Sequence, residues 1–497
     1  MKRISALITV FFIFNLLAIP IYAQPSTAND AAEGQEIEII VEPSEESAPS
    51  QEAADSLEEL EEQLELAAEA AILIEQNTGK VLFEKNADKR LYPASTTKIL
   101  TALLALEYGN MKDTVTVGNE ANLCKPDGSK AGLDLQEEIT LEELIHGLML
   151  PSGNDAAYTI GVYIGRKIAN EPNLPIEEAL NKFADLMNKK ALELGAKNSH
   201  FVNPHGYHDD EHYSTARDLA IITREAMKYD FFRQVVNTPM FTIEDWNGLD
   251  PKDPNKKEIR YWRNSNALIQ RNDKFYYEYA TGVKTGYTSK AGHCLVASAT
   301  KDGLDLISVV LNSTKDGKWT DSTALMEYGF GNYKIFEPVK EKQHIQTVGV
   351  HNHSSDDSGW LDIIAGEGYY DILNKKDINK IEREIVWNPE LLHKDPDSDS
   401  GNLIYLKAPI EQGQQVGSLF LKLGGKTLCQ IPLIAARSVA KKETIVEKLM
   451  PPQSTSDEKS TPSWLWIVGL FIAFLILRST VIRRRRRRRR YIYTKRY

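Results

Sequence analysis

Residues 92–98 read Tyr-Pro-Ala-Ser-Thr-Thr-Lys and contain a Ser-x-x-Lys motif at the start of a helical pattern that runs to Tyr108. Positions three apart lie on one face of a helix, so the Lys98 ammonium can reach the Ser95 hydroxyl. A lysine held among apolar groups and near another cation has its charged form disfavoured, so it can act as a base. Alone the motif is a weak signal that also fits a surface pair, because about one or two matches arise by chance in this length.

Two further stretches carry residue types used in catalysis. Residues 148–157 read Leu-Met-Leu-Pro-Ser-Gly-Asn-Asp-Ala-Ala, and the Ser152-x-Asn154 in them is by itself typical of a turn. Residues 282–288 read Gly-Val-Lys-Thr-Gly-Tyr-Thr, which by itself indicates a strand edge with an exposed lysine. The order Ser-x-x-Lys, Ser-x-Asn, Lys-Thr-Gly is far more specific than any of its parts.

The chain around these motifs combines strand and helix patterns. We expect strands at 71–75, 81–85, 294–300 and 304–312, and helices at 141–149, 176–194 and 215–227. Thr140, with Glu143 three residues later, is an N-terminal capping signal for the first of these helices. Strands at both ends with helices between them predict one α/β (α+β) domain over residues 70–330.

The three motifs in this order resemble the signature of the penicillin-recognising serine acyl enzymes. The chain is similar to a low-molecular-mass penicillin-binding protein of the serine-type D-alanyl-D-alanine carboxypeptidase family, with further matches at 203–206 (Asn-Pro-His-Gly), 264–268 and 284–294. This implies a penicillin-binding/β-lactamase-like transpeptidase fold. One departure is the polar stretch 245–257, which resembles an insertion between the second and third motifs. The resemblance therefore does not define the shape of the rim of the site.

The resemblance also implies roles for the catalytic residues. Ser95 would attack the carbonyl of the penultimate D-alanine of a peptidoglycan stem peptide, and Lys98 would take its proton. Ser152 would relay a proton to the departing D-alanine amine, while Asn154 orients Lys98 and the substrate amide. Water would then hydrolyse the acyl-enzyme, and penicillins would acylate Ser95 in the same way and leave slowly.

The third motif supplies the substrate-binding strand in this family. Lys284 and Thr285 would bind the terminal carboxylate of the peptide by charge and hydrogen bond. Gly286 belongs to the same stretch, and the backbone N–H groups of Tyr287 and Ser95 would form an oxyanion hole. No cofactor and no metal ion is expected.

Two other functions share these motifs. A class A-like β-lactamase needs a deacylating glutamate in Glu-Pro-x-Leu-Asn, and residues 171–175 read Glu-Pro-Asn-Leu-Pro. The last position differs, and Glu171 follows Ser152 by only 19 residues (171 − 152), which is short for that loop. The second alternative is a non-hydrolysing penicillin-binding or wall-binding receptor. The intact nucleophile and both lysines argue against it.

Beyond residue 330 the sequence pattern changes. Short alternating runs at 345–350, 403–407, 419–423 and 427–434, separated by glycine-containing turns, predict a small all-β domain over residues 335–440. The segment 408–417 resembles the β-domain that follows the catalytic domain in the same family. Residues 447–463, with Pro451-Pro452 and several serines, read as a stalk.

Both ends of the chain indicate export and membrane attachment. Residues 1–23 have two early bases, an apolar run and a small residue at Ala23, which is the layout of a signal peptide; an uncleaved anchor is the alternative. Residues 464–482 are almost wholly apolar and would span about 28 Å as a helix, close to the thickness of a bilayer's hydrocarbon core. The tail 483–497 begins with eight arginines, which place it in the cytoplasm.

Charge is distributed unevenly along the 497 residues. The whole chain has a net charge of -11, and residues 24–69 hold fifteen acids and no base, which is typical of a disordered acidic leader. Residues 70–477 are mildly acidic, which argues against nucleic acid as a partner. The partners expected instead are the stem peptide, β-lactam antibiotics as acylating inhibitors, and the membrane.

Several histidines and three cysteines are residue types that can bind a metal ion. His205, His208 and His212 resemble a metal-binding set, but a structural loop is the simpler interpretation, and the same holds for His351 and His353. The cysteines, at positions 124, 294 and 429, are far apart in the sequence, and we expect them to be buried and free.

Overall fold

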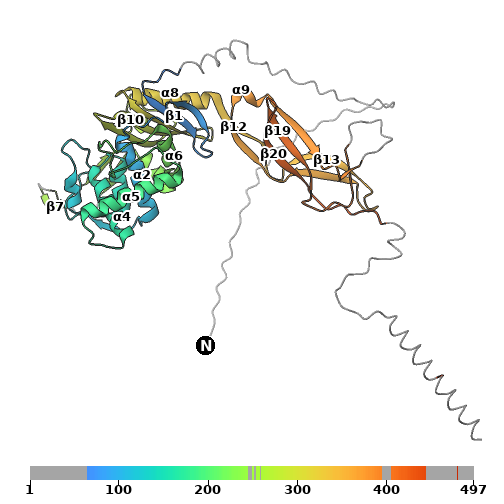
Figure 1. Ribbon diagram of the computed structural model, residues 1–497, viewed down its shortest axis with the longest axis horizontal. Helices are drawn as coiled ribbons and strands as arrows, with labels where there is room; N and C mark the ends of the chain where they lie inside the picture. The colour runs from blue at the N-terminus through green and yellow to red at the C-terminus, as the bar shows by residue number, and fades with distance from the viewer. Residues whose placement is uncertain are drawn as a thin grey trace, which may run out of the picture. The chain divides into compact units, whose positions relative to one another are not determined.

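The computed structural model describes residues 64–243, 249–250, 253–257, 259–393 and 404–443, together with Arg478 (Figure 1). For 249–250 and 253–257 it describes the backbone. The predicted signal peptide, stalk and basic tail, the predicted membrane anchor apart from Arg478, and all of the leader before residue 64 fall outside these residues. None of the helices that the structure describes has the length and apolar character needed to cross a bilayer.

The catalytic part is built on one antiparallel sheet of five strands (Figure 1). Its order is β2 (Val81–Lys85), β1 (Ala70–Glu75), β11 (Leu304–Ser313), β10 (Gly292–Lys301) and β9 (Ala280–Thr288). All six residues of β1 are buried, so both faces of this strand are covered. The strands predicted at the two ends of the domain are present, and β1 pairs with β11 at the centre of the sheet.

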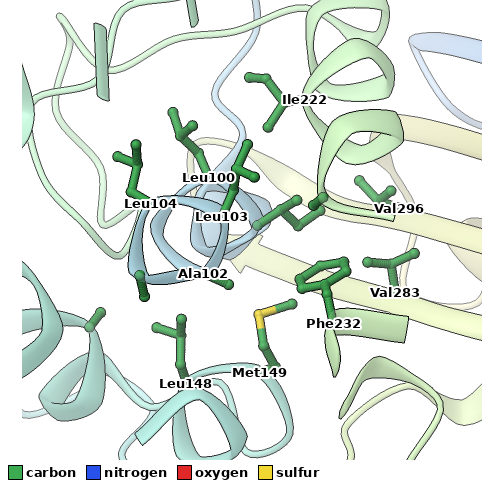
Figure 2. Packing of buried hydrophobic residues seen from close by; sticks show 14 of the residues in the cluster. Leu100, Ala102, Leu103, Leu104, Leu148, Met149, Ile222, Phe232, Val283 and Val296 are labelled. Carbon is green, nitrogen blue, oxygen red and sulfur yellow. The ribbon is translucent and has the colours of Figure 1, made fainter. Parts of the chain in front are cut away.

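The helices of the catalytic part are α2 (Lys98–Tyr108), α3 (Leu141–Met149), α4 (Asn154–Ala169), α5 (Ile176–Leu194), α6 (Ala216–Ala226), α7 (Asp230–Val236) and α8 (Gly317–Asn332). Of these, α6, α7 and α8 contact the strands of the sheet directly, and α3, α4 and α5 pack against other helices. On one face, the leucines of α2 lie at the centre of the core with Phe232, Val283 and Val296 around them (Figure 2). On the other face, Trp319 and Phe330 of α8 pack against Leu295 and Leu306.

The helices predicted from the sequence are confirmed, and three helices of the catalytic part, α4, α7 and α8, were not predicted. Thr140 caps α3 with the reciprocal bonds of a capping box, and α5 ends at Gly195, which has φ +91°. No helix was predicted for α4, because the Pro-Ser-Gly-Asn stretch at which it starts is by itself typical of a turn. No helix was predicted for α8, whose glycines and polar residues obscure its period.

The folded catalytic part begins before residue 70, where the sequence indicated that order starts. Leu66 and Ala68 are buried, at 7% and 1% exposure. The backbone N–H groups of Ala67 and Ala68 donate to the Asp321 carboxylate on α8, at 3.1 and 2.8 Å. The acidic composition of this stretch did not indicate that it is ordered. Its partner Asp321 lies some 250 residues away in the sequence, so no local pattern predicts the contact.

Several small elements surround the main sheet. Two short strands, β3 (Thr114–Thr116) and β4 (Glu138–Thr140), pair with each other, and β5 (Met240–Ile243) pairs with β8 (Arg260–Arg263). The polar stretch predicted to be an insertion falls between β5 and β8, where β6 (Leu249–Asp250) and β7 (Asp253–Lys257) form a hairpin. The short 3-10 helices are η1 (Ala94–Thr97), η2 (Asn119–Leu123) and η3 (Ala267–Ile269).

The C-terminal part is the predicted all-β domain. Its main sheet has the order β16 (Ile381–Trp387), β19 (Gln415–Leu423), β20 (Lys426–Ala435), β14 (Trp360–Ala365), β13 (His344–His351), β18 (Tyr405–Lys407) and β17 (Leu392–His393). A separate pair joins β12 (Tyr333–Val339) to β15 (Tyr369–Asn374), and one short helix, α9 (Lys375–Ile378), follows. Its own apolar core includes Leu361, Leu406 and Leu433, so the domain has an independent packing centre.

Candidate active site

Ser95 lies in η1, which leads directly into α2. The residue before it, Ala94, has φ +49°, a left-handed conformation that L residues rarely adopt. Such a conformation persists only where surrounding contacts hold it. Gly206 provides one of these contacts, because a Cβ at that position would lie 1.8 Å from the Ala94 carbonyl oxygen. The Asn-Pro-His-Gly stretch therefore needs its glycine for the close approach of η1.

A chain of hydrogen bonds also holds the Ala94 carbonyl. The Val202 N–H donates to His212 Nδ1 at 3.1 Å, so the neutral imidazole carries its proton on Nε2. Nε2 lies 2.8 Å from Thr97 Oγ1, and that hydroxyl donates to the Ala94 carbonyl at 2.9 Å. Burial lowers the pKa of His212 to about 3, so the ring stays neutral near pH 7. His212 thus positions the backbone that carries Ser95.

Lys98 lies beneath Ser95 with its side chain fully buried. Its Nζ is 2.9 Å from Ser95 Oγ, and it donates to Asn154 Oδ1 at 2.7 Å and to the His205 carbonyl oxygen at 2.9 Å. An amide oxygen and a peptide carbonyl only accept, so these two partners take two N–H groups of the amine. In the neutral amine the lone pair is then left facing Ser95 Oγ, where it can accept the hydroxyl proton.

The charge state of Lys98 suits this arrangement. Burial is the main cause that holds the pKa of Lys98 well below its ordinary value, and the charge of Lys284 lowers it further. The Asp155 carboxylate acts in the opposite direction. Apolar surroundings and a second cation are the two causes that the sequence had indicated.

The second motif forms the turn that enters α4. Ser152 has φ +65° and is 7% exposed, and Asn154 is the first residue of the helix. The Asp155 carboxylate accepts the backbone N–H groups of residues 131–133, at 2.7, 2.8 and 3.1 Å. These bonds fix the loop that forms one wall of the site. In the described residues, no hydrogen bond joins the Ser152 hydroxyl to Lys98 or Lys284.

The third motif lies on β9, at the edge of the sheet. Lys284 is 1% exposed, and its Nζ donates to the Thr285 carbonyl oxygen at 3.0 Å. Burial and then the charge of Lys318 lower the pKa of Lys284 to about 7. Lys318, on the first turn of α8, is 9% exposed, and its Nζ lies 4.5 Å from the centre of the Trp319 ring. The site therefore has three buried lysines: the charge of Lys318 acts on Lys284, and the charge of Lys284 acts on Lys98.

Gly286 allows β9 to pass directly against the nucleophile. A Cβ at this position would lie 3.0 Å from the Pro93 carbonyl oxygen and 3.1 Å from the Ser95 nitrogen. The next residue, Tyr287, is 59% exposed, and its ring stacks on His293 with 4.4 Å between centres. Beside them opens a cavity of about 500 Å³, lined by Ser95, Asn154 and the segments 127–129, 206–208 and 287–290. The structure thus brings the three motifs together around one cavity.

The Glu-Pro stretch that resembles a β-lactamase loop lies elsewhere. Glu171 comes just after α4, whose 16 residues separate it from Asn154 by about 24 Å at the rise of an α-helix. Glu171 and Pro172 line a different cavity, of about 520 Å³, along α4. A carboxylate at that distance cannot activate water at Ser95.

The histidines noted in the sequence take part in hydrogen bonds and ring contacts within the fold, and the cysteines are free. The Tyr207 N–H donates to His205 Nδ1 at 2.9 Å, and the His208 ring packs edge-on against Tyr92. The His351 ring stacks on His393. In the part of the chain that the structure describes, no three His, Cys, Asp or Glu side chains are grouped to hold a metal ion. The three cysteines are free, with Cys124 and Cys294 buried and Cys429 half-buried.

Sequence reasoning missed several residues of the site. Asp155, His212 and Lys318 all act on it through contacts that cross between distant segments. Asp155 had a usable signal, because an acid directly after Ser-x-Asn at a helix start can hold backbone N–H groups. Lys318 had none, since only the folding of α8 brings it close to Lys284.

Two family models match the chain, one over the catalytic part and one over the C-terminal β-rich part. The model described as D-alanyl-D-alanine carboxypeptidase matches residues 57–315, and the model described as the C-terminal domain of penicillin-binding protein 5 matches residues 333–441. With the fold, these matches define the class as a serine-type hydrolase of the low-molecular-mass penicillin-binding proteins.

Curated relatives are similar in sequence to this chain over most of their own length. The D-alanyl-D-alanine carboxypeptidase DacF of Bacillus subtilis is 34% identical over 383 residues, which cover 75% of this chain and 86% of the relative. The D-alanyl-D-alanine carboxypeptidase DacA of Escherichia coli K12 is 31% identical over 387 residues, covering 75% and 83%. The crystal structure of penicillin-binding protein 5 from Haemophilus influenzae is 28% identical, covers 76% of this chain and 99% of that one, and has a TM-score of 0.52. The chain belongs to the D-alanyl-D-alanine carboxypeptidase family.

The comparisons confirm the predicted family, the activity of a serine-type carboxypeptidase, and the combination of a catalytic domain with an all-β domain. They favour the carboxypeptidase over the β-lactamase alternative.

Proposed function

We propose that this carboxypeptidase releases the terminal D-alanine from peptidoglycan stem peptides through an acyl-enzyme on Ser95. The observation that carries the proposal is the placement of Lys98 Nζ, 2.9 Å from Ser95 Oγ with two acceptors on its other side. Lys98 takes the hydroxyl proton as Ser95 Oγ bonds to the scissile carbonyl carbon. The backbone N–H groups of Ser95 and Tyr287 receive the developing oxyanion.

The leaving group and the second half-reaction follow. Collapse of the tetrahedral intermediate breaks the C–N bond. Ser152 passes its proton to the departing D-alanine amine and receives the proton that Lys98 took from Ser95, so that Lys98 is neutral again. Water then adds to the acyl carbon as Lys98 takes one of its protons. Collapse of this second tetrahedral intermediate breaks the bond between the acyl carbon and Ser95 Oγ, and Lys98 returns the proton to Oγ, which regenerates Ser95 and releases the shortened peptide. Asn154 supports both steps, because its Oδ1 fixes the Lys98 amine and its Nδ2 faces the cavity wall at residue 128.

Recognition of the peptide's free end falls to β9. Lys284 and Thr285 bind the terminal carboxylate, and Gly286 lets this strand pass close to the backbone of Ser95. β-Lactams carry a carboxylate in the matching position, so they acylate Ser95 as inhibitors.

The test uses the purified full chain. Incubation with a peptide that ends in D-Ala-D-Ala should release free D-alanine, and fluorescent penicillin should label the protein. Ser95→Ala should lose both signals while its circular dichroism spectrum stays that of the parent. Labelling or D-alanine release that survives this substitution would refute the assignment of Ser95.

We also infer that the enzyme is exported and held by residues 464–482, with the catalytic domain outside and the arginine-rich tail in the cytoplasm. The support is the sequence pattern at the two ends. A chain truncated after Pro452 should move to the soluble exported fraction and keep its activity. If the truncated chain still sediments with membranes after a salt wash, the anchor is an uncleaved N-terminal segment.

A further inference from the structure

A second cavity lies along α4, separate from the one at Ser95. It measures about 520 Å³ and is lined by residues of α4, β3 and η2 and by the segment 170–172. Among the described residues, none that lines this cavity also lines the cavity at Ser95. The proposed mechanism therefore does not involve it, although its lining contains buried polar groups.

One of these groups is the Glu120 carboxylate, in η2. Glu120 is 3% exposed, and its Oε1 accepts the Gly118 N–H at 2.8 Å. Within the described chain, the carboxylate forms no ion pair and no other hydrogen bond. A carboxylate can accept about four hydrogen bonds, and burying its charge without a positive partner costs free energy. Glu120 therefore has unused capacity for a positively charged donor.

A hydroxyl without a partner belongs to the same lining. Thr159, on α4, is 1% exposed, and its Oγ1 is buried with no hydrogen-bond partner in the described chain. A threonine on a helix commonly donates to the carbonyl oxygen four residues earlier, and this one does not. A polar group that is buried without a hydrogen bond destabilises the fold. A molecule in the cavity can supply the missing partner.

Arg166 provides a positive group further along α4. It lies on the same helix face as Thr159 and Val162, because residues three and four apart are neighbours on a helix. The seven positions between Thr159 and Arg166 (166 − 159) correspond to about 10 Å along the helix axis. Arg166 Nε donates to the Leu174 carbonyl oxygen at 2.9 Å, which fixes the guanidinium. Within the described chain, its terminal N–H groups have no acceptor, and no ion pair joins it to Glu120.

The other charged side chains of the lining already have partners or are exposed. Lys167 Nζ lies 2.9 Å from Asp113 Oδ2, so its charge is paired. Glu171 is exposed to water. Val115 and Val162 are buried and add apolar surface to the lining. The cavity thus combines an anionic receptor, a cationic receptor and apolar surface.

We propose that this cavity binds a small zwitterion whose ammonium group and carboxylate are separated by an apolar segment, such as an ω-amino acid or a short peptide with free ends. Glu120 and Thr159 Oγ1 accept hydrogen bonds from the ammonium, and the terminal N–H groups of Arg166 donate to the carboxylate. An ammonium presents three donors on a compact charge, whereas a guanidinium matches the planar carboxylate with two parallel donors. Each buried group that lacks a partner then gains one.

The experiment is isothermal titration calorimetry of the full-length enzyme with 6-aminohexanoate. Hexylamine and hexanoate each keep the apolar chain but lack one of the two charges. The zwitterion should bind at least about 10-fold more tightly than either, since a hydrogen bond to a charged group contributes that much or more. Glycine, whose charges are adjacent, should also bind at least about 10-fold more weakly. No binding of 6-aminohexanoate, or equal affinities for the four probes, would overturn the proposal.

Substitutions assign the binding to the three receptor groups. Glu120→Gln keeps an oxygen for the Gly118 N–H but removes the charge, so it should weaken binding of 6-aminohexanoate about 10-fold. Arg166→Gln should abolish the preference for 6-aminohexanoate over hexylamine. Thr159→Val should weaken binding in part without lowering the melting temperature of the free protein, because Oγ1 has no partner to lose. Affinity that survives both Glu120→Gln and Arg166→Gln would overturn the proposal.

Two controls separate this cavity from other sites. Glu178→Gln removes an exposed acid of α5 outside the cavity and should leave the affinity for 6-aminohexanoate unchanged. Lys284→Gln should leave it unchanged as well. Loss of binding in Lys284→Gln would place the zwitterion at β9 and overturn the proposal. The calorimetry does not depend on D-alanine release, so its outcome is independent of the proposed function.

Discussion

Titration of Lys284 should make kcat/KM fall at basic pH, and this basic limb should appear only with substrates that carry a free terminal carboxylate. Burial and Lys318 bring the pKa of Lys284 to about 7 in the free enzyme. A carboxylate reader must be protonated, so recognition is lost as the pH rises through that value. The protonated fraction falls from about one half at pH 7 to about one hundredth at pH 9, so kcat/KM for an acid peptide should fall about 50-fold over that interval. Substrate that is already bound provides a counter-ion, so kcat should decline at higher pH than kcat/KM does.

Substitution separates this effect from other titrations. A hydrogen bond between charged partners contributes about 1.5–3 kcal/mol, so Lys284→Gln should cost roughly 10- to 150-fold in kcat/KM near neutral pH. The same substitution should remove the basic limb, and a C-terminally amidated peptide should lose much less. Lys318→Met keeps the stem that packs on Trp319 but removes the neighbouring charge, so it should move the limb to higher pH.

The assay is release of free D-alanine between pH 5 and 10, run in parallel with the rate of penicillin acylation. Equal losses for the acid and amidated peptides in Lys284→Gln would show that Lys284 does not read the carboxylate. A basic limb that stays in place in Lys284→Gln would show that another group causes it.

Three further outcomes follow from the packing of the site. Gly286→Ala should slow penicillin acylation strongly, because the new Cβ would lie 3.0–3.1 Å from the backbone that carries the nucleophile, whereas Gly331→Ala, where nothing lies within 4 Å, should leave acylation unchanged. Asp155→Ala should lower the free energy of unfolding by about 1–3 kcal/mol in urea titrations, since it leaves three backbone N–H groups unpaired, and Asp155→Asn should recover part of the loss. His212→Ala should slow penicillin acylation of Ser95. In the parent protein, His212 should cause no change of activity with pH above pH 5, because its pKa is about 3. A normal acylation rate in His212→Ala would refute the positioning role of His212.

Much of the site was accessible from the sequence because its chemistry is local. Ser95 and Lys98 are three residues apart at a helix start, and that spacing alone brings the amine to the hydroxyl. The order of the three motifs then identified the family. The strands at both ends of the catalytic domain could also be predicted, since their residues are apolar without interruption and bounded by turn signals.

The remainder depends on contacts between distant segments, which no local pattern encodes. The close packing at Gly206 depends on the carbonyl of Ala94, more than a hundred positions earlier. Leu66 and Ala68 are ordered through Asp321, so the acidic composition of that stretch gave the wrong start for the domain. The low pKa of Lys284 arises from its burial and from Lys318, and the sequence gave no sign of either.

The two site lysines are linked, and this linkage yields a test of what makes Lys98 a base. Burial is the larger cause of its low pKa, and the charge of Lys284 is the second. A substrate carboxylate cancels much of that charge but also covers the cavity, so it weakens the second cause and leaves the first intact. Lys98 must therefore be kept neutral mainly by burial, and catalysis must fall at acid pH as Lys98 becomes protonated. Lys284→Gln should move this acid limb of penicillin acylation toward higher pH without abolishing it. A limb that moves toward lower pH would mean that Lys98 and Lys284 do not interact as like charges, and the proposed base would have to be sought elsewhere.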